Sequence, residues 1–265
     1  MNLEIYQVDA FTDRAFSGNP AGVCLTDTDL DDALMRNIAA EMAVSETAFL
    51  NLNTMRLRWF TPQVEVALCG HGTLATAHIL KIRGEEPCFE PVSFSTLSGR
   101  LDASFDGRRI NLSFPAANIT MHHERTHPFM AALGIKATSI LDIATFDQKQ
   151  MFVLSSEQAV LDLAPDFNAL QGIHGRGVVV TAKADRDVDF VSRYFAPWVG
   201  VNEDPVTGSA HCALASYWSE KLNKSKLLGY QASVRGGYVG VENQPSGRVI
   251  LSGHAVTTLS GQLTI

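Results

Sequence analysis

The chain combines segments whose apolar positions alternate with segments in which small and apolar residues fill a helix. Alternation typical of strands occurs in the N-terminal MNLEIYQVDAF. It recurs in RLRWF, RLDASF, RINLSF, GVVVTA and RVILSG. The segments GTLATAHILKI and GSAHCALASYWSEKL show no clear polar stripe until their last turn, and they stop at Gly84 and near Asn223. The pattern predicts strands wrapped around buried helices.

A repeated pattern divides the chain into two related halves. Residues 60–78 read FTPQVEVALCGHGTLATAH and residues 195–216 read FAPWVGVNEDPVTGSAHCALAS, so that Phe, Pro and two Val recur at one constant separation. The glycine and alanines of the two turns match after a short insertion. RINLSFPA at 109–116 parallels RVILSGHA at 248–255 at nearly the same separation. Two collinear echoes favour an internal duplication over chance similarity of short Gly- and Ala-rich stretches.

The duplication predicts an α+β architecture in which a buried helix wrapped by strands is made twice. We expect an N-terminal half at 1–117, a linker at 118–127 and a C-terminal half at 128–265, with the last strand returning to the N-terminal half. A cleft between the halves is the expected ligand site, because ligands commonly bind at domain interfaces.

The composition narrows the classes of function. The 265 residues are 46% apolar and 18% charged, and the net charge of −7 comes without a block of like charges, which argues against nucleic-acid and anionic-membrane partners. Neither a signal peptide nor an apolar run of about 20 residues is present. The cysteines form no CxxC pair, which favours reduced thiols and a cytoplasmic location. They are Cys24, Cys69, Cys88 and Cys212.

In each half a strand leads through a glycine turn into a predicted helix N-terminus. The first amides of a helix lack intrahelical acceptors and lie at the positive end of its dipole, so they attract anions. Residues 70–73 and 207–210 are therefore candidates for holding a carboxylate. No lysine follows as in GxxxxGK, which argues against a nucleotide-phosphate loop. Most such turns merely connect elements, so this signal is weak by itself.

Three polar side chains beside these turns are candidates for chemistry. Cys69 and Asp204 occupy matching positions in the two echoes. A cysteine at a helix N-terminus can have a lowered pKa and act as a base or nucleophile, or it can be a small buried apolar residue. Asp204 can be a turn residue before Pro205, and His71 can be structural or a donor to substrate. The sequence leaves these alternatives open.

A fourth candidate, Glu46, lies between a helical segment that ends at Met42 and the strand-like TAFLNLN. It is flanked by the apolar Val44, Ala48 and Phe49, and apolar surroundings disfavour the charged carboxylate and predict a raised pKa suited to proton transfer. The alternative is a solvent-facing glutamate at a bend, and composition by itself favours it.

Residues 123–127, HERTH, match the HExxH pattern of zinc proteases. That chemistry needs both histidines on one helical face, and Pro128 directly after the motif disfavours a helix through it. We predict an exposed connection at 122–127, a helix beginning near Pro128, and no metal site.

Taken in order along the chain, several motifs resemble the phenazine-biosynthesis PhzF-like isomerases. They are FSGNPAGV, SETAF, LCGHGTLA, EDPVTGSA and the RGG around Arg235. The resemblance implies the diaminopimelate epimerase-like fold, with two pseudo-symmetric halves that each hold a curved sheet around a central helix. It also implies a cofactor-independent isomerase, a homodimer and a small anionic substrate.

The resemblance assigns roles to individual residues. Glu46 matches the catalytic acid/base, and His71 and Asp204 match polar residues of the substrate site. The two turns match substrate-binding positions, and two further residues are candidates for the site, of which Cys69 is replaced by other residues in members of the family. The turn positions are Gly70, Gly72, Thr73, Gly208, Ser209 and Ala210, and the two further residues are Ser45 and Cys69.

Two alternatives remain open beside proton transfer by Glu46. Epimerases of this fold use one cysteine from each half, whereas here Cys69 stands opposite Asp204, and Cys212 lies inside the predicted helix. This departure argues against a two-thiol mechanism and leaves a racemase or epimerase that uses Cys69 against Asp204. A binding protein without catalysis is the other alternative.

Overall fold

The computed structural model describes residues 1–84 and 91–265, which form two compact units. Unit 1 comprises Met1–Phe114 and Ile250–Ile265, and unit 2 comprises Pro115–Val249. Cys88 lies outside the described residues.

Most strands of unit 1 pair in antiparallel fashion, and two pairs of neighbouring strands are parallel. In each parallel pair, the chain passes through one helix on its way from the first strand to the second. Strand β18 pairs with β1, and β1 with β2; β2 runs parallel to β3 with α1 between them in sequence. Strand β4 pairs with β3 and β5 and runs parallel to β6 across α2, and β7 then joins β6 to β8. The elements are β1 (Asn2–Ala10), β2 (Asn19–Thr26), α1 (Asp32–Met42), β3 (Thr47–Asn51), β4 (Arg56–Phe60), β5 (Glu65–Val66), α2 (Gly70–Arg83), β6 (Val92–Thr96), β7 (Gly99–Asp106), β8 (Arg109–Pro115) and β18 (Ala255–Thr264).

Unit 2 repeats this topology. Strands β9 and β10 pair, as β18 and β1 do, and β10 pairs with β11. Strands β11 and β12 are parallel with helices between them, and β13 is parallel to β15 across α6. The elements are β9 (Thr120–His122), α3 (Phe129–Leu133), β10 (Ile140–Phe146), β11 (Lys149–Leu154), α4 (Glu157–Leu161), α5 (Phe167–Gln171), β12 (Val178–Lys183), β13 (Phe190–Ala196), β14 (Val201–Asp204), α6 (Gly208–Leu222), β15 (Lys226–Gln231) and β16 (Gly237–Gln244), with β17 (Arg248–Gly253) at the boundary between the units.

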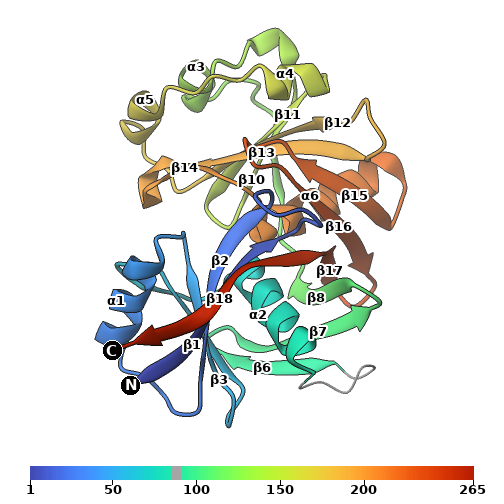
Figure 1. The fold of residues 1–265 in the computed structure, drawn as a ribbon. Helices are drawn as coiled ribbons and strands as arrows, with labels where there is room; N and C mark the ends of the chain where they lie inside the picture. Colours follow the sequence, from blue (N-terminus) through green and yellow to red (C-terminus); the bar gives the residue numbers. More distant parts are fainter. Residues whose placement is uncertain (85–90) are drawn as a thin grey trace. The chain divides into compact units, whose positions relative to one another are not determined.

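The two predicted buried helices are present with the predicted ends. Helix α2 ends at a C-cap Gly84 with φ of 71°, a left-handed conformation that glycine adopts without strain, and α6 ends at a left-handed Asn223. Residues of α2 lie against β1, β2, β3 and β18, and Figure 1 shows the helix beside these long curved strands. Because strands cover most of its sides, α2 buries small and apolar residues around its circumference.

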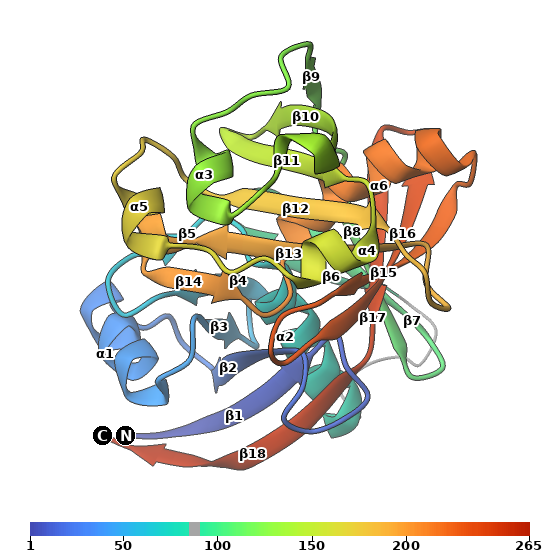
Figure 2. The same cartoon turned by 90° about the horizontal axis from the view of Figure 1, so that it is seen from above.

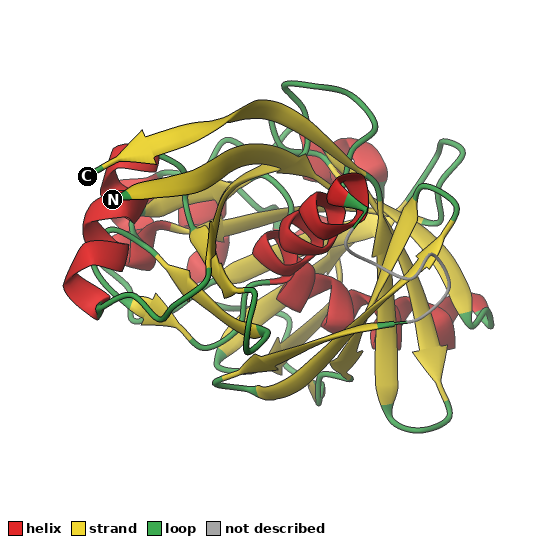
Figure 3. Ribbon diagram, turned by 60° about the horizontal axis from the view of Figure 1, so that its bottom comes forward, coloured by secondary structure: helices red, strands yellow, loops and turns green. Residues whose placement is uncertain are grey.

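The C-terminal strand belongs to unit 1. Strand β18 pairs with β1 along its whole length, and the amide of Ile265 donates to the carbonyl of Met1 at 2.9 Å. The two chain ends therefore lie side by side on neighbouring strands (Figures 2 and 3).

The segment predicted to be a linker, 118–127, contains a strand. Residues of β9 pair with β10 from Thr120 to His122, and this is the place in unit 2 that β18 holds in unit 1. The polar residues after His122 form no regular element, and α3 begins after Pro128. The strand was missed because three residues are too few to show an alternating pattern.

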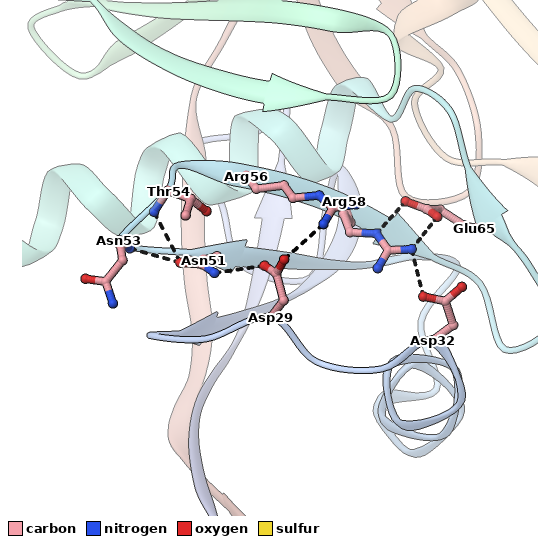
Figure 4. Close-up of polar contacts among 8 residues, drawn as sticks. All are labelled: Asp29, Asp32, Asn51, Asn53, Thr54, Arg56, Arg58 and Glu65. Atoms are coloured by element: carbon pink, nitrogen blue, oxygen red, sulfur yellow. Dashed lines mark hydrogen bonds and ion pairs between the residues drawn. The ribbon is translucent and has the colours of Figure 1, made fainter.

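The duplication extends to one ion pair and its packing. In unit 1 Arg58 donates from Nε and Nη2 to Glu65 at 2.7 and 2.6 Å, and its guanidinium lies 4.9 Å from the ring centre of Phe60. Figure 4 shows this pair on β4 and β5, together with the contact from Arg58 to Asp32. The bidentate contact with the carboxylate pairs the charge of the guanidinium, and the aromatic ring packs against the face of the guanidinium plane.

Unit 2 contains the same arrangement. Arg193 donates to Glu203 at 2.7 and 3.0 Å and lies 4.9 Å from the ring centre of Phe195. Arg193 follows Arg58 at the separation that relates Phe195 to Phe60 in the sequence echo. The duplication is therefore present in side-chain contacts as well as in strand order.

Along the part of the chain that the model describes, none of the helices has the length and apolar character needed to cross a bilayer.

Candidate active site

In unit 1 a carboxylate is held at the junction of a helix and a buried strand. Helix α1 ends at Ala43, whose left-handed conformation turns the chain, and Glu46 immediately precedes β3. The carbonyl of Glu46 accepts from the amide of Gly22 at 3.1 Å, which continues the pairing of β2 with β3. The backbone of Glu46 is therefore fixed by the sheet, and its side chain keeps 21% of its surface exposed.

The N-terminus of α2 supplies a thiol and an imidazole. Cys69 is the N-cap residue, and its Sγ accepts from the amide of Gly72 at 3.4 Å. His71 lies in the first turn, and Cys69 and His71 are 6% and 7% exposed. Both side chains are therefore positioned by the start of the buried helix.

His71 is the centre of the site. Its Nε2 lies 3.2 Å from Oε2 of Glu46 and 3.4 Å from Oγ of Ser45. Its Nδ1 lies 3.4 Å from Nδ2 of Asn19, and the Sγ of Cys69 lies 3.6 and 3.7 Å from the two ring nitrogens. Unit 1 thus brings together four predicted residues, and Asn19, which precedes Pro20 in the FSGNPAGV motif, is a fifth partner that sequence analysis did not assign.

The carboxylate of Glu46 is kept ionised, contrary to the sequence expectation. Burial acts to raise its pKa, but the hydrogen bond and charge of His71 and a hydrogen bond from Ser45 outweigh burial and hold the pKa below its ordinary value. The apolar sequence neighbours predicted the burial correctly and could not show the histidine. The prediction of a raised pKa is wrong for this reason.

The pKa of His71 is shifted upward, opposite to the shift of Glu46. Burial lowers its pKa, but the neighbouring Cys69 and Glu46 favour the imidazolium and raise the pKa well above the usual range. The two residues therefore form an ion pair in which the Nε2 proton faces the carboxylate.

Cys69 is not an activated thiolate. Burial raises the pKa of its thiol, and the charge of Glu46 adds to this, while His71 opposes it. The helix N-terminus does not lower the pKa of this thiol below its ordinary value, as the sequence position suggested it could.

In unit 2, Asp204 supports the N-terminus of α6. Its Oδ2 accepts from the hydroxyl of Thr207 at 2.5 Å, and its carbonyl accepts from Nε2 of Gln231 at 2.7 Å. The Oε1 of Gln231 accepts from the amide of Thr207 at 2.8 Å. Gln231 closes this cluster from β15, which no sequence motif signalled.

The other predicted residues of unit 2 form the first turn of α6. Gly208 and Ala210 are buried, and the hydroxyl of Ser209 accepts from Nζ of Lys149 at 3.0 Å. Burial lowers the pKa of Lys149. A cation therefore stands beside the helix N-terminus, and its place at the start of β11 gave no sequence signal.

The structure corrects the pairing of Cys69 with Asp204. The N-cap residues of α2 and α6 are Cys69 and Thr207, whereas Asp204 is the last residue of β14. Glu203 pairs with Phe195 as Glu65 pairs with Phe60, and three residues then separate the strand from the helix in each unit, 67–69 and 205–207. The insertion in the second echo therefore lies before Glu203, and the correspondence shifts there. A racemase with two equivalent groups would therefore have Cys69 and Thr207 at the matching positions.

One set of side chains has the arrangement of metal ligands. Among the described residues, a carboxylate oxygen of Glu46, the Sγ of Cys69 and a ring nitrogen of His71 lie within 4.8 Å of one another, and the residues of HERTH form no such group. The histidine of HERTH nearest the core, His127, instead packs on Phe129 and Phe152.

Comparison with known proteins gives one consistent result. The model of the family described as phenazine biosynthesis-like protein matches residues 8–261. An uncharacterized isomerase of Halalkalibacterium halodurans is 47% identical, with both chains covered completely. A crystal structure of a phenazine biosynthesis protein of the PhzF family from Enterococcus faecalis is 40% identical with a TM-score of 0.92, and both chains are again covered completely.

The fold is shared more widely. A hydroxyproline epimerase from Agrobacterium vitis, 12% identical, superposes with a TM-score of 0.62 over 99% of this chain and 91% of its own. The predicted epimerase-like α+β fold is confirmed.

Proposed function

Because the chain belongs to the phenazine biosynthesis-like family, we propose that it is an isomerase that moves a proton between carbon atoms of a small, carboxylate-bearing metabolite. Relatives that are 47% and 46% identical over their full lengths are named isomerases, which supports the class of reaction. The acid and base are side chains of this chain.

The observation that carries the proposal is the pair formed by Glu46 and His71. Glu46 is ionised and partly exposed, so that its carboxylate can take a proton from an activated C–H bond of a bound substrate. The resulting carboxylic acid returns that proton to another carbon of the same molecule, and Glu46 ends the cycle as it began.

His71 and Ser45 position the base. Nε2 of His71 lies 3.2 Å from Oε2 of Glu46, and Ser45 forms hydrogen bonds with Glu46 and His71. Because the His71 side chain is buried, the protein around it fixes its orientation. The first amides of α2 lie at the positive end of the helix dipole, which attracts a substrate carboxylate. The preferred substrate is therefore an anion with a carboxylate next to the reacting carbons.

A direct test follows the proton. A metabolite library is screened for compounds that raise the melting temperature, and each hit is incubated in D2O and followed by NMR for isomerisation and for deuterium in the product. We expect turnover in the native protein and in Cys69→Ala, and a loss of at least about a hundredfold in Glu46→Gln. Turnover that survives Glu46→Gln and disappears in Cys69→Ala would contradict the proposal and favour the thiol-dependent racemase.

Glu41→Gln is the matched control for this test. Glu41 is an exposed glutamate on α1, in the same segment of the chain, and carries the same functional group. We expect native turnover from this variant.

A further inference from the structure

The side chains of Glu46, Cys69 and His71 together provide the types of donor atom that bind zinc and cadmium. Nε2 of His71 lies 3.7 Å from Sγ of Cys69 and 3.2 Å from Oε2 of Glu46. All three donors lie within 4.8 Å of one another. Two of them are held by the first turn of α2 and the third by the start of β3.

These distances match the edges of a tetrahedral zinc site. Bond lengths of about 2.3 Å to sulfur, about 2.0 Å to nitrogen and about 2.1 Å to oxygen place sulfur and nitrogen about 3.6 Å apart and nitrogen and oxygen about 3.4 Å apart. The two edges that meet at Nε2 therefore already have nearly the required length. The sulfur is equally close to Nδ1, at 3.6 Å, so forming the site also takes a rotation of the Cys69 side chain or of the His71 ring that brings the sulfur to the Nε2 side.

The chemistry of the donors selects the class of cation. Thiolate and imidazole favour zinc and cadmium, whereas magnesium and calcium take oxygen ligands. Three protein ligands leave a fourth position open, as in zinc sites that bind water. Nδ2 of Asn19 lies 3.4 Å from the other ring nitrogen, Nδ1, so Asn19 contacts the ring on the side away from Nε2.

We propose that a thiophilic divalent cation, Zn2+ or Cd2+, binds to Cys69 Sγ, His71 Nε2 and Glu46, and that it inhibits the enzyme by occupying its proton-transfer pair. On binding, the thiol proton and the proton on Nε2 pass to solvent, and the cation takes their place. The binding stands on the geometry of unit 1 by itself, and the inhibition rests on the proposed function.

The binding is tested with the cation alone. The protein is treated with chelator, exchanged into metal-free buffer and titrated with Cd2+, while the thiolate-to-cadmium charge-transfer absorption and the heat of binding are recorded. We expect one Cd2+ per chain, a charge-transfer band in the native protein, and no band in Cys69→Ala. Glu46→Gln and His71→Asn keep the thiol and are expected to bind at least about tenfold more weakly, since each removes one ligand.

Cys212→Ala is the matched control. Cys212 is also a buried cysteine on a buried helix, 7% exposed, and burial raises its pKa to about 12, but the described residues place no histidine and carboxylate group around it. This variant is expected to bind Cd2+ as the native protein does. A band that persists in Cys69→Ala, or no stoichiometric binding in protein whose circular dichroism and melting temperature are native, would overturn the metal site.

The two proposals fail separately. Stoichiometric Cd2+ binding that depends on Cys69, together with undiminished turnover in its presence, would overturn the inhibition and the role of Glu46 while leaving the metal site in place. Loss of turnover in Glu46→Gln without any Cd2+ binding to the native protein would overturn the metal site and leave the isomerase proposal in place. Reversal of inhibition by chelator is the result expected if both hold.

Discussion

Glu46 Oε2 and His71 Nε2 lie 3.2 Å apart, which joins the end of the α1 segment to the first turn of α2. This contact reverses the effect of burial on the carboxylate. Burial acts to raise the pKa of the Glu46 carboxyl, and His71 holds that pKa below its ordinary value, so the base is ionised and available. The sign of this effect can be measured in several ways.

Replacing His71 by Asn is expected to move the acidic limb of the pH–rate profile to higher pH. Without the imidazolium, only the hydrogen bond from Ser45 still opposes burial, so the pKa of Glu46 rises and a higher pH is needed to ionise the base. The measurement is kcat/KM against pH with the substrate from the screen. Ser45→Ala removes a lesser contribution and is expected to move the limb in the same direction by less. An unmoved limb in His71→Asn would show that the pair does not set the protonation of Glu46.

The ion pair is also expected to make stability depend on pH within a defined window. The pKa of Glu46 is lowered in the folded protein, so its contribution is present above the ordinary value of 4.5 and is lost as pH falls through the folded pKa. The pKa of His71 is raised, so its contribution is complete below the ordinary value of 6.5 and is lost as pH rises through the folded pKa. The difference in free energy of unfolding between native protein and Glu46→Gln is therefore largest between pH 4.5 and 6.5, as urea denaturation at a series of pH values would show. A difference that does not vary with pH would contradict the pairing.

The ion pairs of Arg58 and Arg193 are expected to contribute more to the free energy of unfolding than an exposed ion pair does. Arg58→Lys and Arg193→Lys keep the positive charge but lose the bidentate contact with the glutamate carboxylate. We expect each substitution to lower the free energy of unfolding by about 1–3 kcal/mol. Both arginine side chains are 13% exposed. Arg100→Lys is the control, since Arg100 and Asp102 are 70% and 41% exposed, and it is expected to cost about 0–1 kcal/mol. Equal losses in all three variants would contradict a special role for the paired arrangement.

Gly72 is expected to be intolerant of even one added methyl group. A Cβ there would lie 2.8 Å from Cδ1 of Trp59 and 3.0 Å from Sγ of Cys69, so one of these side chains must move. We expect Gly72→Ala to cost about 1–3 kcal/mol and to weaken Cd2+ binding by displacing the sulfur. Gly261→Ala, in β18 with nothing within 4 Å of the added atom, is the control for thermal unfolding and for Cd2+ titration. A native melting temperature in Gly72→Ala would show that the site can absorb the strain.

The predicted role of Asp204 can be separated from that of Glu46. Asp204→Asn keeps an oxygen that can accept from Thr207, so unit 2 is expected to fold, but it removes the negative charge. We expect a lower kcat with unchanged Cd2+ binding, because the three proposed ligands belong to unit 1. Native kcat in this variant would restrict Asp204 to supporting the N-terminus of α6.

Much of the architecture was predictable because the duplication is visible as a repeated sequence pattern. The echo around Phe60 and Phe195 located two strand–turn–helix segments, and the helix ends at Gly84 and Asn223 followed from local preferences. Strand β9 was missed because it is short, and its place is set by pairing with β10, which lies far along the chain. The pairing of Cys69 with Asp204 was wrong because sequence matching placed the insertion after the strand, whereas the strand pairing places it before Glu203.

The sequence by itself determined the two related halves, the glycine turns that begin α2 and α6, and the residues able to do acid–base chemistry. Only the tertiary structure decided that Glu46, Cys69 and His71 meet, because the pairing of β2 with β3 and the start of a buried helix bring together residues that are separate in the chain. It also decided the state of the base. Burial and an opposite charge shift a carboxyl pKa in opposite directions, and which one prevails depends on a distance of 3.2 Å that no sequence pattern records.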